Sequence, residues 1–579
     1  MAKMYKLLFY LLTLIIVTLI NACKSNPIVT TKFGQIKGFS GNYGDHNYEA
    51  FLGIPFAQPP LGHLRFQLPQ PFNSTWSTPY EAVNFKDGCV QNPESYFNFN
   101  ISEDCLYLNL WRPEINDENN SELLPVFYLM HGSGYIKKSG ALPPNQGDVL
   151  AATQKIIVVN SNYRLGAFGF AHGSHTSMPG NLGIYDTLTV LRWIRHNIRS
   201  FGGDPNRVTL AGQSAGSKIA SLLATLPDEF DSQSLFSRLI MMSGVATNQI
   251  HAENVSVALA KTRLLASKVN CLSQVDQFES SNELSDETID CLKKVDASDL
   301  LKAQNSEDIT AIGCSEISVF LPVYGTDLIP DQPMINHARQ IESIKDKPML
   351  FGAEQDEATL FVAVSCVFSL SDAYAYITKR VSFAIKDIKP DQIDYFYKHY
   401  FNDADPSDSY DIRSRCVKLC SDMNYNCPSL ILSEFFSQEN PDIHFFLNTY
   451  VGEKLAQNDG RLYGTLHGDD VKFGLGDPIR QYNLYTPNDR KFSQFFLNLF
   501  GNFTKGLNFD DWPSIAVDMN DYESLQIIKK LNLPPTNIVD HDQQICIKWA
   551  ELFNYSIPQF QTSDKNQEIE SKLLNNIAY

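Results

Sequence analysis

The sequence predicts an α/β fold in which a large, mostly parallel twisted sheet carries helices on both faces. Two observations lead to this prediction. Short apolar runs with strand character alternate along the chain with segments that have helical spacing. The 579 residues also contain no internal repeat and no linker rich in Pro, Gly or Ser, although their length would allow several domains. We therefore expect one large domain over residues 24–579.

The expected elements follow one another in the order that this fold requires. Leu124–Met130 and Lys155–Val159 are apolar enough to be buried strands, and Thr187–Ile198 has apolar residues at helical spacing. The other elements expected are strands at Arg207–Ala211, Leu239–Met242 and Lys347–Phe351 and a helix at Lys218–Ala224. Functional residues of such sheets lie at the carboxyl ends of the strands.

Ser214 lies where the strand Arg207–Ala211 meets the following helix. Its surroundings read Gly-Gln-Ser-Ala-Gly from Gly212 to Gly216. A strand, Gly-x-Ser-x-Gly and a helix in succession are typical of a nucleophile elbow. The tight turn crowds the positions two before and two after the serine, and glycine tolerates that crowding. Many loops match the bare pattern by chance, so the flanking elements carry the prediction.

A serine nucleophile requires a base, and the base requires an orienting carboxylate. Downstream of Ser214, three carboxylates follow the strand Lys347–Phe351, namely Glu354, Asp356 and Glu357, and His467 lies in a glycine-rich loop. The order serine, acid, histidine is the one that follows a nucleophile elbow. The carboxylates could equally form a solvated loop, and spacing alone does not choose among the histidines.

The glycine-rich turn His131–Tyr135 follows the strand Leu124–Met130. Such a turn can point backbone N–H groups into a cleft, as an oxyanion hole requires. An ordinary turn at a strand end would have a similar sequence.

The N-terminus resembles a secretory signal over residues 1–22. Two lysines precede the apolar run Leu7–Ile20, and the small residue Ala22 follows it. The run is shorter than the roughly 20 residues of a membrane anchor. Ile20–Cys23 is faintly similar to a bacterial lipoprotein box, which Asn21 fits poorly. We expect secretion or a vesicular lumen, without stable membrane insertion after cleavage.

Glycosylation motifs and cysteines are consistent with that route. Asn-x-Ser/Thr motifs begin at Asn73, Asn100, Asn120, Asn254, Asn502 and Asn554, and some of them could be unused. In an oxidising compartment the 11 cysteines are disulfide candidates before they are reactive thiols. The formal net charge of −18 argues against nucleic acid and anionic membranes as partners.

Several long motifs identify a family. They are Phe51–Gly62, Arg65-Phe66, Glu103–Asn109, Asn162–Gly166, Gly180–Gly183 and Phe201–Gly216. With these motifs the chain resembles the type-B carboxylesterase/cholinesterase family of α/β-hydrolases from about Gly34 to Ile547.

The resemblance implies a serine carboxylesterase that hydrolyses small-molecule esters through an acyl-enzyme and needs no metal or organic cofactor. It assigns Ser214 as nucleophile, Glu357 as acid and His467 as base. The oxyanion donors would be the backbone N–H groups of Ser133, Gly134 and Ala215. Two positions depart from the family pattern, because Ser133 stands where glycine is usual and Gln213 where glutamate is frequent.

The resemblance also implies disulfides and a substrate preference. The expected pairs are Cys89–Cys105, Cys271–Cys291 and Cys427–Cys546, while Cys314, Cys366, Cys416 and Cys420 have no partner in the family pattern. Cholinesterases hold a quaternary ammonium against a tryptophan in the loop between the first pair. Here that loop, Val90–Asp104, contains Tyr96, Phe97 and Phe99 but no tryptophan. We therefore expect neutral esters to be preferred over choline esters.

A function without catalysis is the alternative. The family includes adhesion proteins and a hormone precursor that commonly lack a triad residue, and a storage or structural protein with vestigial activity would be a third case. This chain keeps all three triad residues. Its oligomeric state is not indicated by the sequence.

Overall fold

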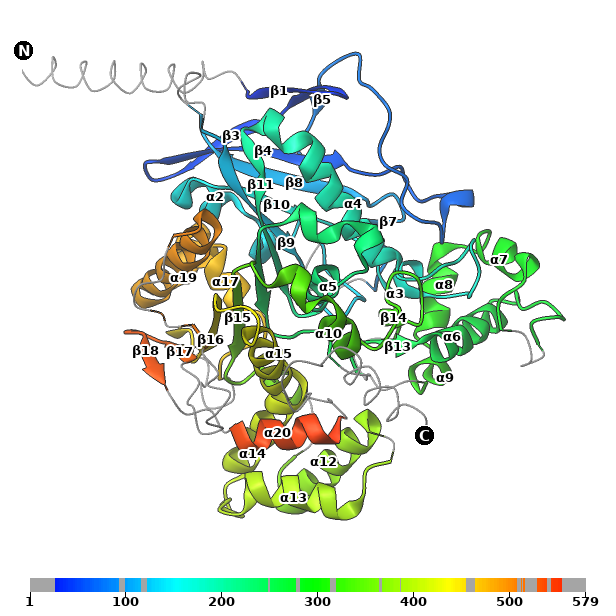
Figure 1. The fold of residues 1–579 in the computed structure, drawn as a ribbon, viewed down its shortest axis with the longest axis vertical. Coiled ribbons are helices and arrows are strands. Elements are labelled where there is room, and N and C mark those ends of the chain that lie inside the picture. Colours follow the sequence, from blue (N-terminus) through cyan, green and yellow to red (C-terminus); the bar gives the residue numbers. More distant parts are fainter. Residues whose placement is uncertain are drawn as a thin grey trace, which may run out of the picture.

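A central sheet of 11 strands forms the core of the computed structural model (Figure 1). The structure describes residues 26–92, 99–115, 122–247, 250–277, 282–312, 319–363, 367–385, 387–453, 464–507, 512, 514–515, 528–538 and 543–553. In spatial order the strands are β18 (Thr536–Ile538), β17 (Ile528–Leu531), β16 (Ile443–Asn448), β15 (Met349–Glu354), β12 (Arg238–Met242), β11 (Gly203–Gln213), β9 (Leu124–Met130), β10 (Ile157–Ser161), β8 (Tyr107–Pro113), β4 (His46–Pro55) and β3 (Phe39–Tyr43). The predicted α/β fold is confirmed.

The middle of the sheet is parallel, and its edges are antiparallel. Strands from β10 through β9, β11, β12, β15 and β16 to β17 pair in parallel. The edge pairs β10–β8, β8–β4, β4–β3 and β17–β18 are antiparallel. The carboxyl ends of the parallel strands therefore meet along one edge of the sheet, where side chains from distant parts of the chain can converge.

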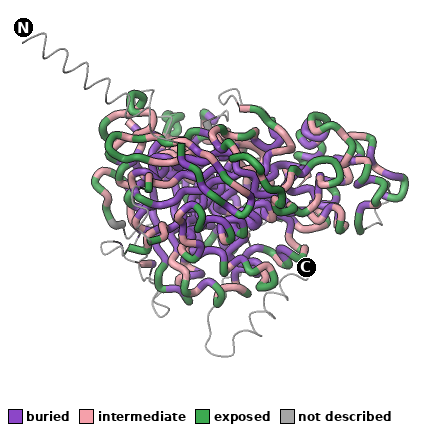
Figure 2. Tube along the Cα trace, turned by 90° about the horizontal axis from the view of Figure 1, so that it is seen from above, coloured by how far each residue is buried: buried purple, intermediate pink, exposed green. Residues whose placement is uncertain are grey.

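Each parallel strand is buried on both faces. Along β9, Val126, Tyr128 and Met130 belong to one apolar core, while Phe127 and Leu129 belong to the other. Successive side chains of a strand point to opposite faces, so a strand covered on both sides must be apolar throughout. Figure 2 shows the buried residues concentrated in the middle of the molecule, with exposed residues around them.

Helices cover the two faces as separate layers (Figure 1). On one face lie α2 (Asp148–Gln154), α17 (Asp469–Gly474), α18 (Asp477–Arg480) and α19 (Pro487–Lys505). On the other face lie α3 (Gly166–Phe170), α4 (Leu182–Asn197), α5 (Ala215–Ala224), α10 (Pro333–Ile344) and α15 (Cys427–Ser437).

A further group of helices lies beyond β15 and β16 (Figure 1). It consists of α11 (Thr359–Ala363), α12 (Leu370–Ala384), α13 (Pro390–Phe401), α14 (Ser409–Ser421) and α20 (Gln543–Leu552). One π-helical turn, η6 (Asp422–Asn426), joins α14 to α15. Such turns are rare and frequently occur at functional sites. In this chain the turn contributes residues to the pocket described below.

Smaller elements surround the sheet. The helices α6 (Val255–Lys268), α7 (Asp286–Leu292), α8 (Ala297–Gln304) and α9 (Glu307–Thr310) form a group after β12, at the right of Figure 1. The short strands are β1 (Ile28–Thr31), β2 (Gly34–Lys37), β5 (Tyr80–Glu81), β6 (Gly88–Cys89), β7 (Ile101–Ser102), β13 (Glu253–Asn254) and β14 (Val323–Tyr324). Within the described ranges, no helix has the length and apolar character needed to cross a membrane.

Among the described residues, three disulfides connect these parts, and they are the pairs that the family resemblance implies. Cys89–Cys105 closes the loop before β8, and Cys271–Cys291 joins the segment after α6 to α7. Cys427–Cys546 fastens α15 to α20 across 119 residues. Cys416 and Cys420 are buried on α14, whereas Cys314 and Cys366 lie outside the described residues.

Candidate active site

Ser214 occupies the turn between β11 and α5 in a strained conformation. Its φ is 56° and its ψ is −120°, a combination that side chains rarely adopt. A Cβ on Gly212 would lie 2.2 Å from the Gly216 carbonyl oxygen, and a Cβ on Gly216 would lie 2.1 Å from the Met130 carbonyl oxygen. Both neighbours are backbone atoms that cannot move aside. The close packing therefore requires glycine at these two positions. A nucleophile elbow requires glycine at the same two positions.

His467 and Glu357 form a hydrogen-bonded pair beside this turn. His467 Nδ1 lies 2.5 Å from Glu357 Oε2, and the other carboxylate oxygen of Glu357 accepts the backbone N–H of Glu354 at 2.9 Å. A carboxylate acceptor places the imidazole proton on Nδ1, which leaves the lone pair on Nε2. The Glu357 side chain is fully buried. The structure thus brings together Ser214, Glu357 and His467, which are far apart in sequence.

Gln213 contacts the reactive side of the imidazole. Its amide Nε2 lies 3.3 Å from His467 Nε2, and the residue is buried. Since His467 Nε2 carries the lone pair, the amide of Gln213 is the donor. Among the described residues, Ser214 Oγ forms no hydrogen bond with His467 in this arrangement. Catalytic hydrogen bonds are often incomplete in the absence of substrate.

The turn after β9 contains three consecutive residues with a positive φ. Ser133, Gly134 and Tyr135 have φ values of 91°, 62° and 62°. Ser133 therefore adopts the left-handed region at a position where glycine would be unstrained. In the part of the chain that the structure describes, the N–H groups of Ser133, Gly134 and Ala215 donate to no acceptor. Three backbone donors near Ser214 are thus available to a ligand oxygen.

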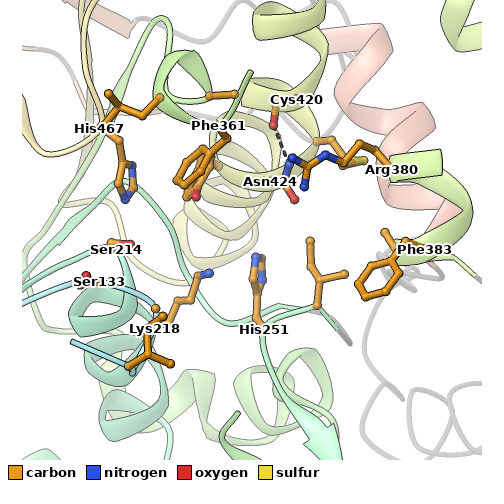
Figure 3. Close-up of a pocket in the computed structure, with 18 of the residues that line it drawn as sticks. Ser133, Ser214, Lys218, His251, Phe361, Arg380, Phe383, Cys420, Asn424 and His467 are labelled. Carbon is orange, nitrogen blue, oxygen red and sulfur yellow. Dashed lines mark hydrogen bonds between the residues drawn. The ribbon is translucent and has the colours of Figure 1, made fainter. Parts of the chain in front are cut away.

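A pocket of about 440 Å³ opens in front of Ser214 and His467 (Figure 3). Its walls come from the turn after β9, from α5, from the connection after β12, and from α11, α12 and η6. Aromatic rings flank His467, since Tyr425 lies 4.7 Å and Phe361 6.0 Å from the imidazole between ring centroids. A volume of this size suits a small organic ligand.

The charged side chains that line the pocket are all basic. Lys137, Lys138, Lys218 and Arg380 line it, and no Asp or Glu side chain is among its described lining residues. This local sign is the opposite of the formal net charge of −18. The net charge did not predict this basic lining, because it sums all charged residues of the chain and does not show which of them the fold places at the pocket.

A second pair of acidic residues lies buried behind His467. The Asp470 N–H donates to Glu354 Oε1 at 2.9 Å, Asn448 donates to Glu354 Oε2 at 2.7 Å, and Ser243 donates to Asp470 at 3.0 Å. Burial raises the pKa of Glu354 well above its ordinary value, and burial followed by the charge of Glu357 raises the pKa of Asp470 to about 7. These bonds join the strand end of β15 to the start of α17 and so hold the loop that carries His467.

The structure rejects the solvated-loop interpretation of Glu354, Asp356 and Glu357. Glu354 and Glu357 have no exposed surface. Asp356 accepts the Thr465 N–H at 3.2 Å and donates its own N–H to Thr465 Oγ1 at 2.9 Å, which fixes the strand-end turn against the His467 loop. The sequence reasoning missed the supporting role of Asp470, although the pairing of two acidic residues directly after His467 and Gly468 was a usable signal.

None of the described glycosylation motifs lines the pocket. Asn73 and Asn100 are exposed and Asn254 and Asn502 partly exposed, whereas Asn120 and Asn554 lie outside the described residues, as do Tyr96 and Phe97 of the loop between the first cysteine pair. The described part of the chain contains no group of three or more His, Cys, Asp or Glu residues placed to hold a metal ion.

Comparison with known proteins agrees with the fold. An α/β sheet with a serine at a strand-to-helix elbow defines a hydrolase class. A family model described as "Carboxylesterase family" matches residues 25–543 of the chain. Acetylcholinesterase-1 of Trittame loki is 30% identical over 528 residues, covering 86% of this chain and 90% of that protein. Cholinesterase of Mus musculus is 30% identical over 502 residues, covering 83% of this chain and 78% of that protein.

A third relative covers still more of the chain. Acetylcholinesterase of Bungarus fasciatus is 27% identical over 571 residues, covering 93% of this chain and 88% of that protein. These matches show that the chain belongs to the carboxylesterase family, which comprises serine hydrolases of carboxylic esters. The predicted family is confirmed, and ester hydrolysis is the class of activity that the family supports.

Proposed function

We propose that the protein is a secreted serine carboxylesterase in which Ser214, His467 and Glu357 form the catalytic triad. One observation carries the proposal: His467, which is hydrogen-bonded to the buried Glu357, lines the same pocket as Ser214 at its strained elbow. The elbow, a buried acid and an imidazole with its lone pair on Nε2 are the parts that acyl transfer requires.

The chemistry proceeds in two halves. His467 Nε2 exchanges its contact with Gln213 for the Ser214 hydroxyl and takes its proton as Oγ bonds to the ester carbonyl carbon. The carbonyl oxygen becomes an oxyanion, which the N–H groups of Ser133, Gly134 and Ala215 stabilise at roughly 3–4 kcal/mol for a critical donor. The alcohol leaves with the proton from His467, and water then hydrolyses the acyl-enzyme by the same route.

The activity of a Ser214→Ala variant tests this assignment. We expect kcat/KM for a chromogenic acetate ester to fall by several orders of magnitude, as removal of a triad nucleophile does. The melting temperature should not fall, because alanine removes one hydroxyl that makes no hydrogen bond in the described structure. Wild-type protein without esterase activity would favour the non-catalytic alternative, and a fully active variant would exclude Ser214 as the nucleophile.

Secretion and glycosylation belong to the same proposal. Residues 1–22 would be removed as a signal, residues 24–579 would fold as one domain, and the exposed Asn73 and Asn100 are the most accessible described acceptors. N-terminal sequencing of secreted protein checks the cleavage. The mass change after treatment with an amidase that removes N-glycans checks the modification.

A further inference from the structure

The pocket in front of Ser214 contains a cationic group without a counter-ion. Lys218 lies on α5, and its backbone N–H donates to the Ser214 carbonyl oxygen at 2.9 Å. Its ammonium forms no ion pair in the described part of the chain, and its nearest aromatic contact is the Tyr425 ring at 5.8 Å. Lys218 is partly buried, and a cation over a tyrosine ring gains only about 0.5–2 kcal/mol, which does not replace the hydration that its ammonium loses.

His251 lies in the same pocket with no hydrogen bond. Its exposed fraction is 1%, and neither Nδ1 nor Nε2 has a partner among the described residues, although the Asn424 backbone is close. Figure 3 shows the imidazole pointing into the pocket between Lys218 and Phe383. An unsatisfied buried donor is costly, so such a group indicates a ligand that accepts its hydrogen bond.

Arg380 contributes a second positive charge from the opposite wall. It extends from α12, and its Nε donates to the Tyr376 hydroxyl at 3.0 Å, which orients the guanidinium. Figure 3 shows the guanidinium turned toward Asn424, across the pocket from Lys218 and His251. An arginine oriented in this way adds positive charge to this wall of the pocket, and that charge attracts an anion.

We propose that these three side chains form a carboxylate-binding subsite, so that the preferred substrates are half-esters of short dicarboxylic acids or acyl esters of hydroxy acids. The proposal rests on the proposed esterase function. The Lys218 backbone N–H donates to the Ser214 carbonyl oxygen, and the two residues line the same pocket. A carboxylate a few bonds from the ester carbonyl therefore reaches the ammonium while the carbonyl carbon lies at Ser214.

The single N–H donor of the neutral His251 ring and the positive charges of Lys218 and Arg380 favour an anion over a neutral ligand of the same shape. A cation in this position would be repelled by both charges. Hydrolysis of such a half-ester consumes one water molecule and releases the dicarboxylate, the alcohol and one proton. The formal net charge of −18 does not oppose this preference. Salt screens the distant surface charges, whereas Lys218 and Arg380 lie close to the ligand.

Two matched series of esters test the proposal. The acyl-side series compares monomethyl glutarate with methyl hexanoate and with the methyl ester of γ-butyrobetaine. The alcohol-side series compares the acetate ester of γ-hydroxybutyrate with pentyl acetate. At pH 7 we expect kcat/KM to be about tenfold or more higher for the anionic ester in at least one series, and lowest for the cation. Equal or better turnover of the neutral esters in both series would overturn the proposal.

Substitutions connect the preference to the residues. Lys218→Met should lower the ratio of anionic to neutral kcat/KM by about tenfold, and Lys218→Arg should retain much of it. Lys302→Met removes the same charge from an exposed position on α8 and should not change the ratio. Arg380→Gln provides a second, independent variant if Lys218→Met does not fold. An unchanged ratio in both variants would refute the subsite.

A binding measurement separates this inference from the proposed function. Calorimetric titration of the Ser214→Ala variant with monomethyl glutarate should give a Kd about tenfold or more lower than with methyl hexanoate, and adding Lys218→Met should abolish the difference. Anion binding without any ester turnover in the wild type would contradict the esterase function and leave the subsite standing. Turnover with no difference in Kd or in kcat/KM would remove the subsite alone.

Discussion

Gln213 offers a direct way to perturb the base without touching the triad. Its amide nitrogen lies 3.3 Å from His467 Nε2, the atom that would receive the proton of Ser214. Gln213→Glu keeps the length of the side chain and replaces the neutral donor with a carboxylate. A carboxylate at this position favours the charged imidazolium, which cannot act as the base.

The size of the effect follows from this distance. Two unit charges 3.3 Å apart interact by about 5 kcal/mol at an effective dielectric constant of 20. Burial of the new carboxylate opposes this gain, because position 213 is only 3% exposed. We therefore expect a net displacement of about one to three pH units, equivalent to about 1.4–4 kcal/mol.

The pH dependence of kcat/KM for a neutral ester measures the displacement. In Gln213→Glu the acid limb should move to higher pH by at least about one unit. Gln70→Glu adds the same charge at an exposed position and should leave the limb in place. An unmoved or lowered limb in Gln213→Glu would show that this side chain does not couple to His467, and would refute the hydrogen-bond assignment.

Four other predictions concern separate parts of the molecule. Burial lowers the pKa of Lys218 to about 8, although the charge of Glu357 raises it, and His251, Tyr425 and Arg380 line the same pocket. Lys218 carries its charge below this pKa. The preference for anionic esters in kcat/KM profiles should therefore decline as the pH rises above about 8. Removing the Cys427–Cys546 disulfide by a double alanine substitution should lower the free energy of unfolding, measured by urea titration, by roughly 4–5 kcal/mol. An unchanged free energy would show that this disulfide does not restrict the denatured state. Acetylcholine should have a lower kcat/KM than its neutral carbon isostere, and a choline preference of about tenfold would contradict this. Gly216→Ala should lower the free energy of unfolding by about 1–3 kcal/mol and impair turnover, because its Cβ would lie 2.1 Å from a backbone oxygen; a stable, active variant would refute the crowding argument.

Much of the fold could be predicted because buried parallel strands are apolar along their whole length. The run Leu124–Met130 coincides with β9, and the run Leu239–Met242 falls within β12. Boundaries were less accurate where polar residues continue a strand. We expected a strand at Arg207–Ala211, but β11 extends over Gly203–Gln213, because its first residues pair with β9 across an irregular register.

The candidate site was predictable where local geometry restricts the residue type. The glycines around Ser214 are such a case, since backbone atoms occupy the space that a Cβ would need. The basic lining of the pocket was not predictable. Lys218, His251 and Arg380 come from three separated elements, and only the folded chain brings them to one cavity. The same holds for the buried contact between Asp470 and Glu354, which are 116 residues apart.

Covalent labelling tests the central claim most directly. A fluorophosphonate reacts with an activated serine and forms a stable adduct at its oxygen. We expect the intact mass of the wild-type protein to increase by one phosphonyl group, peptide mapping to locate this group on Ser214, and Ser214→Ala to remain unmodified. Equal labelling of both proteins, or an adduct at another residue, would contradict the assignment of Ser214 as the nucleophile.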